Sequence, residues 1–148
     1  MCTNGSTPHF ANCTFVGNSA SNGSFLRTDD YLAPVFERCI VAFHSPAPLV
    51  ECLYGQPVFT CSDVYGNAGG DWVEPCMAWQ AEIEGNFSAD PLFCDLAGQD
   101  YHLDCLSPCV PGQQPDCGLI GALEVGCGVS AATRESWGLV KTLFRLAP

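Results

Sequence analysis

Charged side chains are scarce in this sequence, and basic ones are the scarcest. Charged residues make up 14% of the 148 residues, against about 25% in an average domain. Five Lys and Arg face sixteen Asp and Glu, for a net charge of −11. Nucleic-acid binding needs a basic surface, so this charge argues against a nucleic-acid partner. The hydrophobic content of 47% predicts one folded domain rather than a disordered chain.

Several sequence signals are absent as well. No apolar run approaches the roughly 18 residues of a membrane span, and residues 1–5 lack the charged and apolar regions of a signal peptide. No Cys-x-x-Cys pair occurs, and the tightest spacing, Cys105 to Cys109, is poor for zinc. No catalytic motif is visible. We predict no cofactor, no metal and no transmembrane segment, and expect a fragment or C-terminal module of a longer protein.

Cysteine, by contrast, is abundant. Eleven cysteines in one chain predict an oxidising environment, and therefore an extracellular or cell-surface location. Their odd number leaves at least one thiol without a partner in the chain. Six of them crowd into residues 76–127, where crosslinks worth roughly 2–4 kcal/mol each would hold a thin core. Proximity predicts the pairs Cys76–Cys94 and Cys109–Cys117.

A degenerate repeat organises the first half of the chain. The tripeptides that begin at Pro8, Pro34 and Pro57 each end in Phe and begin similar apolar stretches, 26 and then 23 residues apart. Such a period predicts a solenoid, in which one repeat cannot bury its own apolar face. The repeat predicts stacked columns: Phe10, Phe36 and Phe59; Cys13 and Cys39; Phe15, Val41 and Val64; Val16, Ala42 and Tyr65.

The repeat also predicts corners and side strands. Gly17-Asn18 and Gly66-Asn67 suit corners, because both residue types tolerate positive φ. Cys61 comes one position earlier in its repeat than Cys13 and Cys39, which would turn its side chain to the other face and indicates an irregular corner. Residues 19–33 and 47–56 would close the first two turns and pair in parallel, with a short strand around Leu49–Leu53.

Three segments are expected on this basis: β-helix rungs over 1–75, a Cys-rich C-terminal cap of the solenoid over 76–128, and an amphipathic tail helix over 129–148. In the tail, apolar residues recur at helical spacing between Ser130 and Arg145. Three basic residues, Arg134, Lys141 and Arg145, line another face. Docking of this helix onto the acidic body is the favoured interpretation, and adhesion to an anionic membrane or a partner is the alternative.

The pattern Pro-x-Phe-x-x-Cys-x-Phe-Val-Gly-Asn over residues 8–18 resembles right-handed parallel β-helix proteins of the pectate-lyase-like superfold, which occurs in secreted bacterial proteins. The stretch 85–109 is similar to the terminal rungs of such proteins, with Gln99 where the family often has Gly. The resemblance covers residues 8–128. It implies an all-β fold: a short right-handed parallel β-helix with a Cys-rich, loop-rich C-terminal cap and a short terminal helix. It also implies secretion, but no particular activity, because this superfold hosts enzymes, adhesins and structural proteins.

Candidate site residues are few. Polysaccharide lyases of this superfold combine acidic calcium ligands with a basic residue, for which the candidates are Asp63, Asp71, Asp90, Asp95, Asp100 and Arg38. We see no matched cluster among them and interpret Asp90 as a turn former. We interpret His9, His44 and His102 as corner or surface residues, Cys13 and Cys39 as stacked small hydrophobic residues, and Trp72 and Trp79 as core rather than a sugar-stacking platform. We predict no catalytic residue.

The main functional hypothesis is a non-catalytic C-terminal part of a secreted or cell-surface parallel β-helix protein. It would serve as a scaffold, an adhesin or a carbohydrate-binding surface, with a polysaccharide or another surface protein as its partner. One alternative is the tail of a polysaccharide lyase or glycoside hydrolase whose catalytic rungs lie upstream. The weaker one is a stand-alone disulfide-rich module.

Overall fold

In the computed structural model, which describes residues 7–28, 33–46 and 48–128, the chain is an all-β parallel β-solenoid with very little helix. The fold class expected from the sequence is therefore confirmed. The predicted tail helix and its docking fall on residues 129–148, outside the described residues. The proposed segment boundaries stay a prediction.

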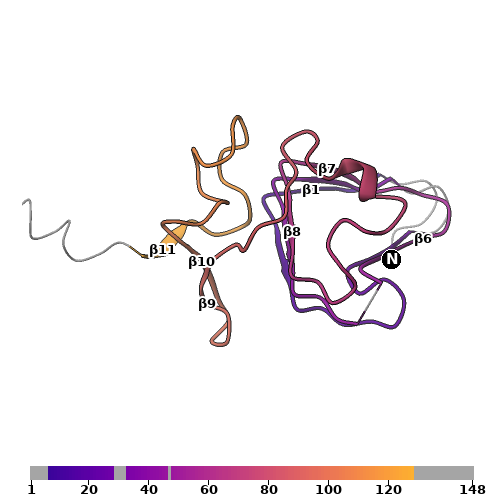
Figure 1. Cartoon of the computed structure of the whole chain (residues 1–148), viewed down its shortest axis with the longest axis horizontal. Coiled ribbons are helices and arrows are strands. Elements are labelled where there is room, and N and C mark those ends of the chain that lie inside the picture. Colours follow the sequence, from indigo (N-terminus) through magenta and orange to yellow (C-terminus); the bar gives the residue numbers. More distant parts are fainter. Residues whose placement is uncertain (1–6, 29–32, 47, 129–148) are drawn as a thin grey trace, which may run out of the picture.

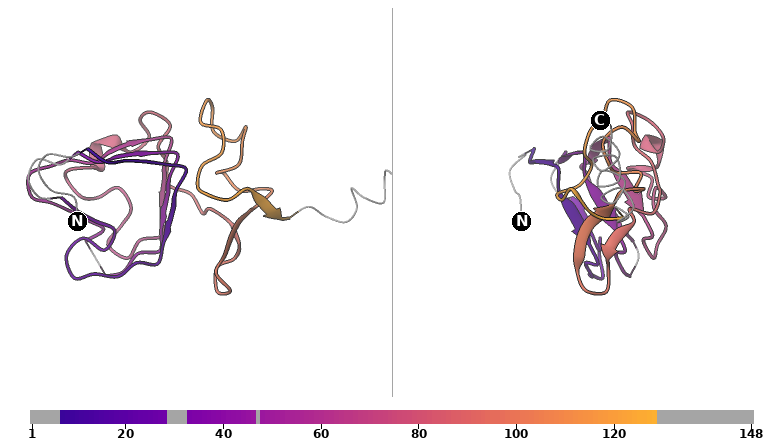
Figure 2. Two further views of the ribbon diagram at one scale, coloured as in Figure 1. Left: turned by 180° about the vertical axis from the view of Figure 1, so that it is seen from behind. Right: turned by 90° about the vertical axis from the view of Figure 1, so that its left-hand side faces the viewer.

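The turns of the solenoid contribute short strands to three faces (Figures 1 and 2). The first turn holds β1 (His9–Ala11), β2 (Thr14–Val16) and β3 (Leu26–Thr28); the second holds β4 (Val35–Glu37), β5 (Ile40–Ala42) and β6 (Val50–Cys52); the third holds β7 (Val58–Thr60) and β8 (Asp63–Tyr65). The sheets run β1–β4–β7, β2–β5–β8 and β3–β6, all parallel. Two faces thus have three strands and the third face has two.

The predicted register of the repeat is confirmed. Phe36 pairs with Phe10 on one side and with Phe59 on the other. Their rings stack at centroid distances of 5.1 and 4.9 Å, with interplanar angles of 9° and 17°. The columns that begin at Phe15 and Val16 also pair as expected. One apolar side chain per turn therefore builds a continuous column in the solenoid core, because parallel strands in register place equivalent side chains above one another.

The irregular corner predicted at Cys61 is not found: the backbone of this corner is regular, and only the type of residue at it changes. Cys61 has φ 50° and occupies the corner that Asn12 and Arg38 occupy in the turns before it, with φ 49° and 52°. Ser62 then stands where Cys39 stands one turn earlier, and its Oγ accepts a hydrogen bond from the Cys39 amide at 3.1 Å. The shift by one residue removes the Cys61 sulfur from the core column and places it in a disulfide with Cys117.

A second corner is built from side-chain amides. Asn67 accepts a hydrogen bond from the His44 amide at 3.0 Å and donates one to the Val41 carbonyl at 3.2 Å. The asparagine therefore bonds the backbone of the preceding turn, as its position at a corner predicts. His44 takes the equivalent place one turn earlier, with its Nε2 3.2 Å from the Phe15 carbonyl oxygen.

Residues 71–88, here called the closing loop, cover the last turn with buried side chains and an isolated parallel bridge between Asp63 and Phe87 instead of a full strand. Its one helical element is the 3-10 turn η1 (Ala78–Gln80). Gln80 accepts from the Phe59 amide and donates to the Pro57 carbonyl, both at 2.8 Å. Asn86 accepts from the Ser62 amide at 3.0 Å and donates to the Phe59 carbonyl at 2.9 Å. Buried amide side chains thus satisfy backbone groups at the sheet edge that a further strand would otherwise bond.

Residues 89–128, here called the Cys-rich module, lie beyond β8 and against the outer face of the β2–β5–β8 sheet (Figure 1). The module holds β9 (Phe93–Asp95), β10 (Asp100–Asp104) and β11 (Val125–Cys127) in the order β11–β10–β9. A Cβ added at Gly121 would stand 2.6 Å from the Ile40 side chain, so the module packs closely on β5. All three residues of β5 are consequently buried, since the solenoid core covers one face and the module the other. Gln99 has φ 62° in the β9–β10 turn, the conformation that a glycine there would favour.

The disulfide pairs predicted from proximity are wrong. The bonds are Cys52–Cys76, Cys61–Cys117 and Cys94–Cys127, with sequence separations of 24, 56 and 33 residues. Only the last lies within the module, whereas the first two attach the closing loop and the module to turns of the solenoid. Proximity along the chain failed because the fold brings residues from different turns together, which sequence spacing does not report. Cys13, Cys39, Cys105 and Cys109 are free thiols.

Candidate functional site

Arg38, the candidate base, lies among local partners. Its guanidinium is 2.9 Å from Glu37 Oε1 and donates to Asn12 Oδ1 at 3.2 Å. Asn12 in turn donates to the Leu119 carbonyl at 2.7 Å, which joins this corner to the Cys-rich module. The same Glu37 carboxylate lies 3.1 Å from His9 Nε2. The structure therefore brings Arg38 together with a glutamate and an asparagine, and with none of the five candidate aspartates.

Four of the five aspartates accept hydrogen bonds from groups close in the sequence: three from backbone amides and one from the corner residue Asn67. Asp90, Asp95 and Asp100 each accept a backbone amide two or three residues later in the chain, at 2.9, 2.9 and 3.1 Å. The interpretation of Asp90 as a turn former is thereby confirmed. Asp71 accepts from the amide and the side chain of Asn67, both at 3.0 Å. Among residues 7–28, 33–46 and 48–128, no three His, Cys, Asp or Glu side chains gather as metal ligands would.

The three histidines lie at corners or on the surface, as expected, but two of them have carboxylate partners that the sequence analysis missed. His102 Nδ1 is 2.6 Å from Asp100 Oδ1, because residues i and i+2 of β10 share a face. His9 meets Glu37 across the β1–β4 pair. Each pair is about half exposed. His44 is buried, and burial lowers its pKa, so it is neutral at physiological pH.

The two tryptophans do not share a surface. Trp72 packs edge-on against Phe59, with ring centroids 5.3 Å apart, and its Nε1 donates to the Phe87 carbonyl at 3.0 Å. The interpretation of Trp72 as a core residue is confirmed. For Trp79 it is wrong, because this residue is 57% exposed on η1. The buried residue of this 3-10 turn is the adjacent Gln80, so the polar side chain is inside and the indole is outside.

The buried cysteines Cys39 and Cys109 are not suited to act as nucleophiles. Cys39 is fully buried in the solenoid core, and burial raises the pKa of its thiol to about 11. It is therefore a neutral thiol at physiological pH, which agrees with the interpretation as a stacked small hydrophobic residue. Burial and the neighbouring Asp63 raise the pKa of Cys109 as well.

Asp63 is the most unusual ionisable residue of the molecule. It is fully buried between β8 and the Cys-rich module. Its Oδ1 accepts from the Ala89 amide at 3.1 Å, and its Oδ2 accepts from the Cys109 thiol at 3.4 Å. Burial raises the pKa of this carboxyl to about 7, although these hydrogen bonds act in the opposite direction. Asp63 therefore links the module to the solenoid and has no access to a substrate.

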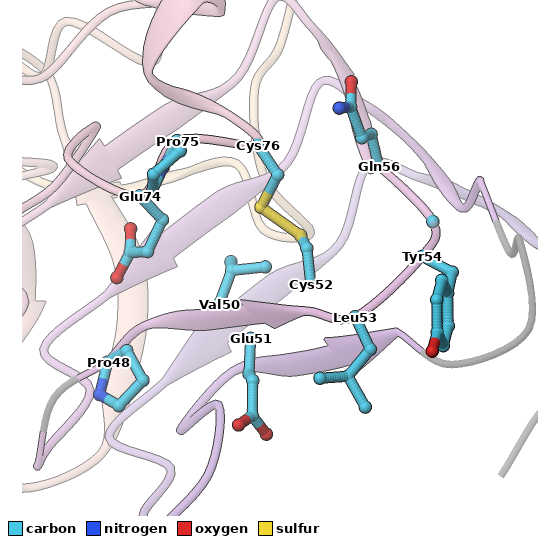
Figure 3. A pocket seen from close by; sticks show the side chains of 11 residues that line it. Pro48, Val50, Glu51, Cys52, Leu53, Tyr54, Gln56, Glu74, Pro75 and Cys76 are labelled. Carbon is cyan, nitrogen blue, oxygen red and sulfur yellow. A yellow bond between two sulfur atoms is a disulfide. The ribbon is translucent and has the colours of Figure 1, made fainter.

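A cavity of about 450 Å³ lies along the outer edge of β6 (Figure 3). Residues 48 and 50–56 form one side of this groove, and Glu74, Pro75 and Cys76 form the other. The disulfide Cys52–Cys76 joins the two sides. Its volume falls within the roughly 300–1,000 Å³ that is usual for ligand sites.

Glu74 occupies one end of the groove, and it is only 8% exposed. In Figure 3 its carboxylate points toward the side of the groove that holds Pro48 and Val50. One oxygen, Oε1, accepts from the Leu49 amide at 2.7 Å. The other, Oε2, is buried and has no hydrogen-bond partner among the described residues. A buried carboxylate oxygen without a donor is costly, which makes Glu74 the strongest indication of a ligand in the molecule.

The rim at the other end is apolar and exposed. Leu53 and Tyr54, which follow β6, are 46% and 68% exposed. On the outer face of the same strand, Glu51 lies 3.2 Å from Arg27 across the β3–β6 pair, so its charge is partly balanced. The groove therefore combines an apolar rim, an unpaired strand edge and one buried carboxylate.

This groove was not predicted from the sequence. The short strand around Leu49–Leu53 was predicted, but Glu74 lies in a different turn and belongs to no motif. A buried glutamate cannot be told from a surface glutamate without knowing what packs on it. The one available signal was Cys52 and Cys76, whose pairing would have placed the two walls together.

The described residues hold no helix that is long and apolar enough to cross a membrane. Comparison of the chain with protein-family models, with curated proteins and with solved structures found no match. The fold and the groove therefore carry the functional argument by themselves.

Proposed function

We propose that this chain is a non-catalytic scaffold of the cell exterior, namely the C-terminal part of a secreted or surface-attached parallel β-helix protein. The observation that carries the proposal is the use of ionisable and amide side chains to close the solenoid. Asp63, Gln80 and Asn86 are buried and bonded to backbone groups, so they hold the fold together rather than face a substrate.

Two further properties support an exterior location. Three disulfides, two of which span different parts of the fold, are typical of proteins that mature under oxidising conditions. A net charge of −11 with few lysines keeps the surface soluble and repels anionic polymers. The preferred partners are therefore neutral or basic: a neutral polysaccharide or another surface protein.

The apolar column supports a place at the end of a longer solenoid. Phe36 and Phe59 are buried in the second and third turns, whereas Phe10 in the first turn is only partly buried. A further turn before the first would cover Phe10 as the second turn covers Phe36. The third turn needs no such cover, because the closing loop already bonds its backbone.

Disulfide mapping by mass spectrometry on protein secreted through an oxidising compartment tests the proposal. We expect the bonds Cys52–Cys76, Cys61–Cys117 and Cys94–Cys127, with Cys13, Cys39 and Cys109 found as thiols. Mostly reduced cysteines that titrate with zinc would instead indicate a reducing compartment and would overturn the exterior location.

The second candidate is the tail of a polysaccharide lyase or glycoside hydrolase. The groove with its buried Glu74 is the observation in its favour, because glycosidases use carboxylates in clefts. Reducing-sugar and unsaturated-product assays on neutral and acidic polysaccharides separate the two. Turnover that Glu74→Gln abolishes would establish the enzyme and refute the scaffold, whereas we expect no turnover. The third candidate is that the chain is a stand-alone disulfide-rich module, which requires that it folds without further turns. Limited proteolysis of the chain expressed by itself tests this directly.

A further inference from the structure

Three N-glycosylation sequons lie among the described residues. They begin at Asn12, Asn22 and Asn86, and each has Thr or Ser two positions later. N-linked glycosylation requires this Asn-x-Ser/Thr pattern and attaches a bulky, hydrophilic group that has to stay on the surface. The pattern is the same at all three sites, so the surroundings of each asparagine decide which of them tolerates a glycan. A fourth sequon begins at Asn4, outside the described residues.

Two of these asparagines use both hydrogens of the side-chain amide. Asn86 is 3% exposed, and its Nδ2 donates to two backbone carbonyls at 2.9 and 3.2 Å. The Nδ2 of Asn12 donates to the carbonyls of Leu119 and Gly121 at 2.7 and 3.4 Å, where the Cys-rich module packs on the first turn. N-glycosylation replaces one amide hydrogen by a sugar. A glycan at either site would therefore break one of these bonds and push packed segments apart.

Asn22 lies in an exposed loop between β2 and β3. Residues 17–22 are all exposed, and the Asn22 side chain makes no hydrogen bond or ion pair with any residue that the structure describes. Gly23 follows with φ 65°, at a position where a side chain would clash with the backbone. Ser24 is buried, and its hydroxyl and amide both donate to the Pro48 carbonyl, at 3.3 and 2.9 Å. The chain therefore enters the fold at Ser24 and leaves Asn22 outside.

We propose that Asn22 is an acceptor for an N-linked glycan, whereas Asn12 and Asn86 stay unmodified in the folded protein. A sugar on Asn22 extends into solvent and breaks no bond to the described residues. The inference rests on the proposed exterior location, because N-glycans are added in a secretory compartment. It goes beyond the scaffold role, which requires no modification of the chain.

The modification is a substitution at a sugar carbon. The donor is an oligosaccharide carried on a polyprenyl pyrophosphate, and an oligosaccharyltransferase of the secretory membrane transfers it. A bond forms between Asn22 Nδ2 and C1 of the first sugar, the bond from C1 to the pyrophosphate oxygen breaks, and the amide nitrogen loses one proton. Nothing is oxidised or reduced.

The transfer precedes folding of this loop, because the Ser24 hydroxyl that the sequon requires is buried in the folded protein. The fold therefore does not decide which sequons the transferase reaches. It decides which glycans are compatible with the native structure. Chains with a sugar on Asn12 cannot dock the module, and those with a sugar on Asn86 cannot close the last turn.

Mass spectrometry of the full chain, secreted by a eukaryotic cell line, tests the proposal. Asn4→Gln is present in every form, so that only the three described sequons remain. We expect one glycan per molecule, attached to Asn22. An amidase that releases N-glycans should remove the mass shift and convert Asn22 to Asp. The midpoint of thermal unfolding should be the same before and after release, because the native contacts do not involve this side chain.

Substitutions in the same loop separate the sequon from other attachments. Asn22→Gln should lose the whole mass shift. Asn18→Gln is the matched control, since Asn18 is exposed in the same loop and begins no sequon, and it should keep the shift. Ser24→Thr retains both the sequon and the hydroxyl and should stay glycosylated, whereas Ser24→Ala should not.

Three results would overturn the inference: an unmodified Asn22 in the secreted protein, a glycan on Asn12 or Asn86 in folded molecules, or a mass shift that survives Asn22→Gln. Disulfides are mapped on the same sample. The three expected bonds together with an unmodified Asn22 refute this inference and leave the scaffold proposal standing. Reduced cysteines refute the exterior location and this inference together.

Discussion

The turns of the solenoid and the Cys-rich module are stabilised in different ways. In the turns, equivalent residues repeat and stack, so that Phe10, Phe36 and Phe59 form one column and the backbone pairs in register. In the module, no repeat exists, and a small core around Leu103, Cys109 and Ile120 is supplemented by disulfides.

The difference shows that stacking between repeats stabilises the turns, whereas crosslinks stabilise the segment that has no repeat. A repeat lets each turn use the next as its core partner, so the cost of ordering is offset by local stacking. A segment without a repeat has no such partner and buries less apolar surface per residue. The disulfide Cys61–Cys117 and the buried Asp63 then tie it to the outer face of the β2–β5–β8 sheet.

The largest effect is expected from Phe36→Ala. This side chain is 2% exposed and stacks on both neighbours, so its loss leaves a cavity in the middle of the column. We expect the free energy of unfolding to fall by about 5 kcal/mol, measured by denaturant titration. Phe93→Ala in the module is the control, and its half-buried ring should cost less than half as much. Equal losses of unfolding free energy in the two variants would contradict the conclusion that stacking stabilises the turns more than it stabilises the module.

The double variant Cys61→Ala with Cys117→Ala comes next. Removal of this bond, which spans 56 residues, should cost about 4 kcal/mol in the chain-entropy model. Because it joins the module to the solenoid, hydrogen exchange should accelerate in β9 to β11 and remain slow in β4 and β5. The bond Cys94–Cys127 lies within the module, so its removal should leave the docking of the module intact. A module that stays protected without Cys61–Cys117 would show that packing alone docks it.

Asp63 makes the stability of the protein depend on pH, because it is buried where β8 meets the Cys-rich module. Its folded-state pKa of about 7 exceeds the ordinary value of 3.8, so folding favours the protonated carboxyl. Its stabilising contribution is complete below about pH 3.8 and is lost as the pH rises through about 7, on the order of 4 kcal/mol in total.

Unfolding free energies measured from pH 4 to 8 test this dependence. Asp63→Asn should flatten the profile over that range, because the amide does not titrate. The control Asp116→Asn changes an exposed carboxyl of the Cys-rich module that does not act on Asp63, and it should keep the slope. A wild-type profile without this decrease would show that Asp63 is ionised in the folded protein.

The smallest effect on stability is expected at the corner where His44 and Asn67 occupy equivalent places in successive turns. His44 occupies the place that asparagine holds one turn later, and its Nδ1 is buried without a partner among the described residues. His44→Asn should change stability at pH 7 by less than about 1 kcal/mol.

Lowering the pH from 7 to 5 should destabilise the wild type more than the variant. Burial lowers the pKa of His44, so its contribution is present at neutral pH and is lost as the pH falls below about 6.5. Thermal unfolding at both pH values measures this. If the variant loses stability equally at both, the imidazole contributes a contact that asparagine cannot replace.

Much of the fold could be predicted from the repeat. The positions of Phe10, Phe36 and Phe59 set the turn length and the register. The one-residue shift of Cys61 correctly indicated a sulfur that leaves the core column, although the corner itself is regular. These predictions succeeded because they depend on periodicity, which is a local property of the chain. The disulfides, the exposure of Trp79 and the carboxylate partners of His9 and His102 were not predicted.

The sequence by itself determined a parallel solenoid with an apolar column, because the repeat period and the size of the side chains can be read directly along the chain. Its cysteine content predicts an oxidising environment. Only the tertiary structure decided where the non-repeating residues lie. It placed the Cys-rich module on a side face, buried Asp63 beneath it, and set Glu74 beside β6 in a groove without a third strand. The physical reason is that such contacts join segments far apart in the chain, whose meeting depends on the packing of every turn between them.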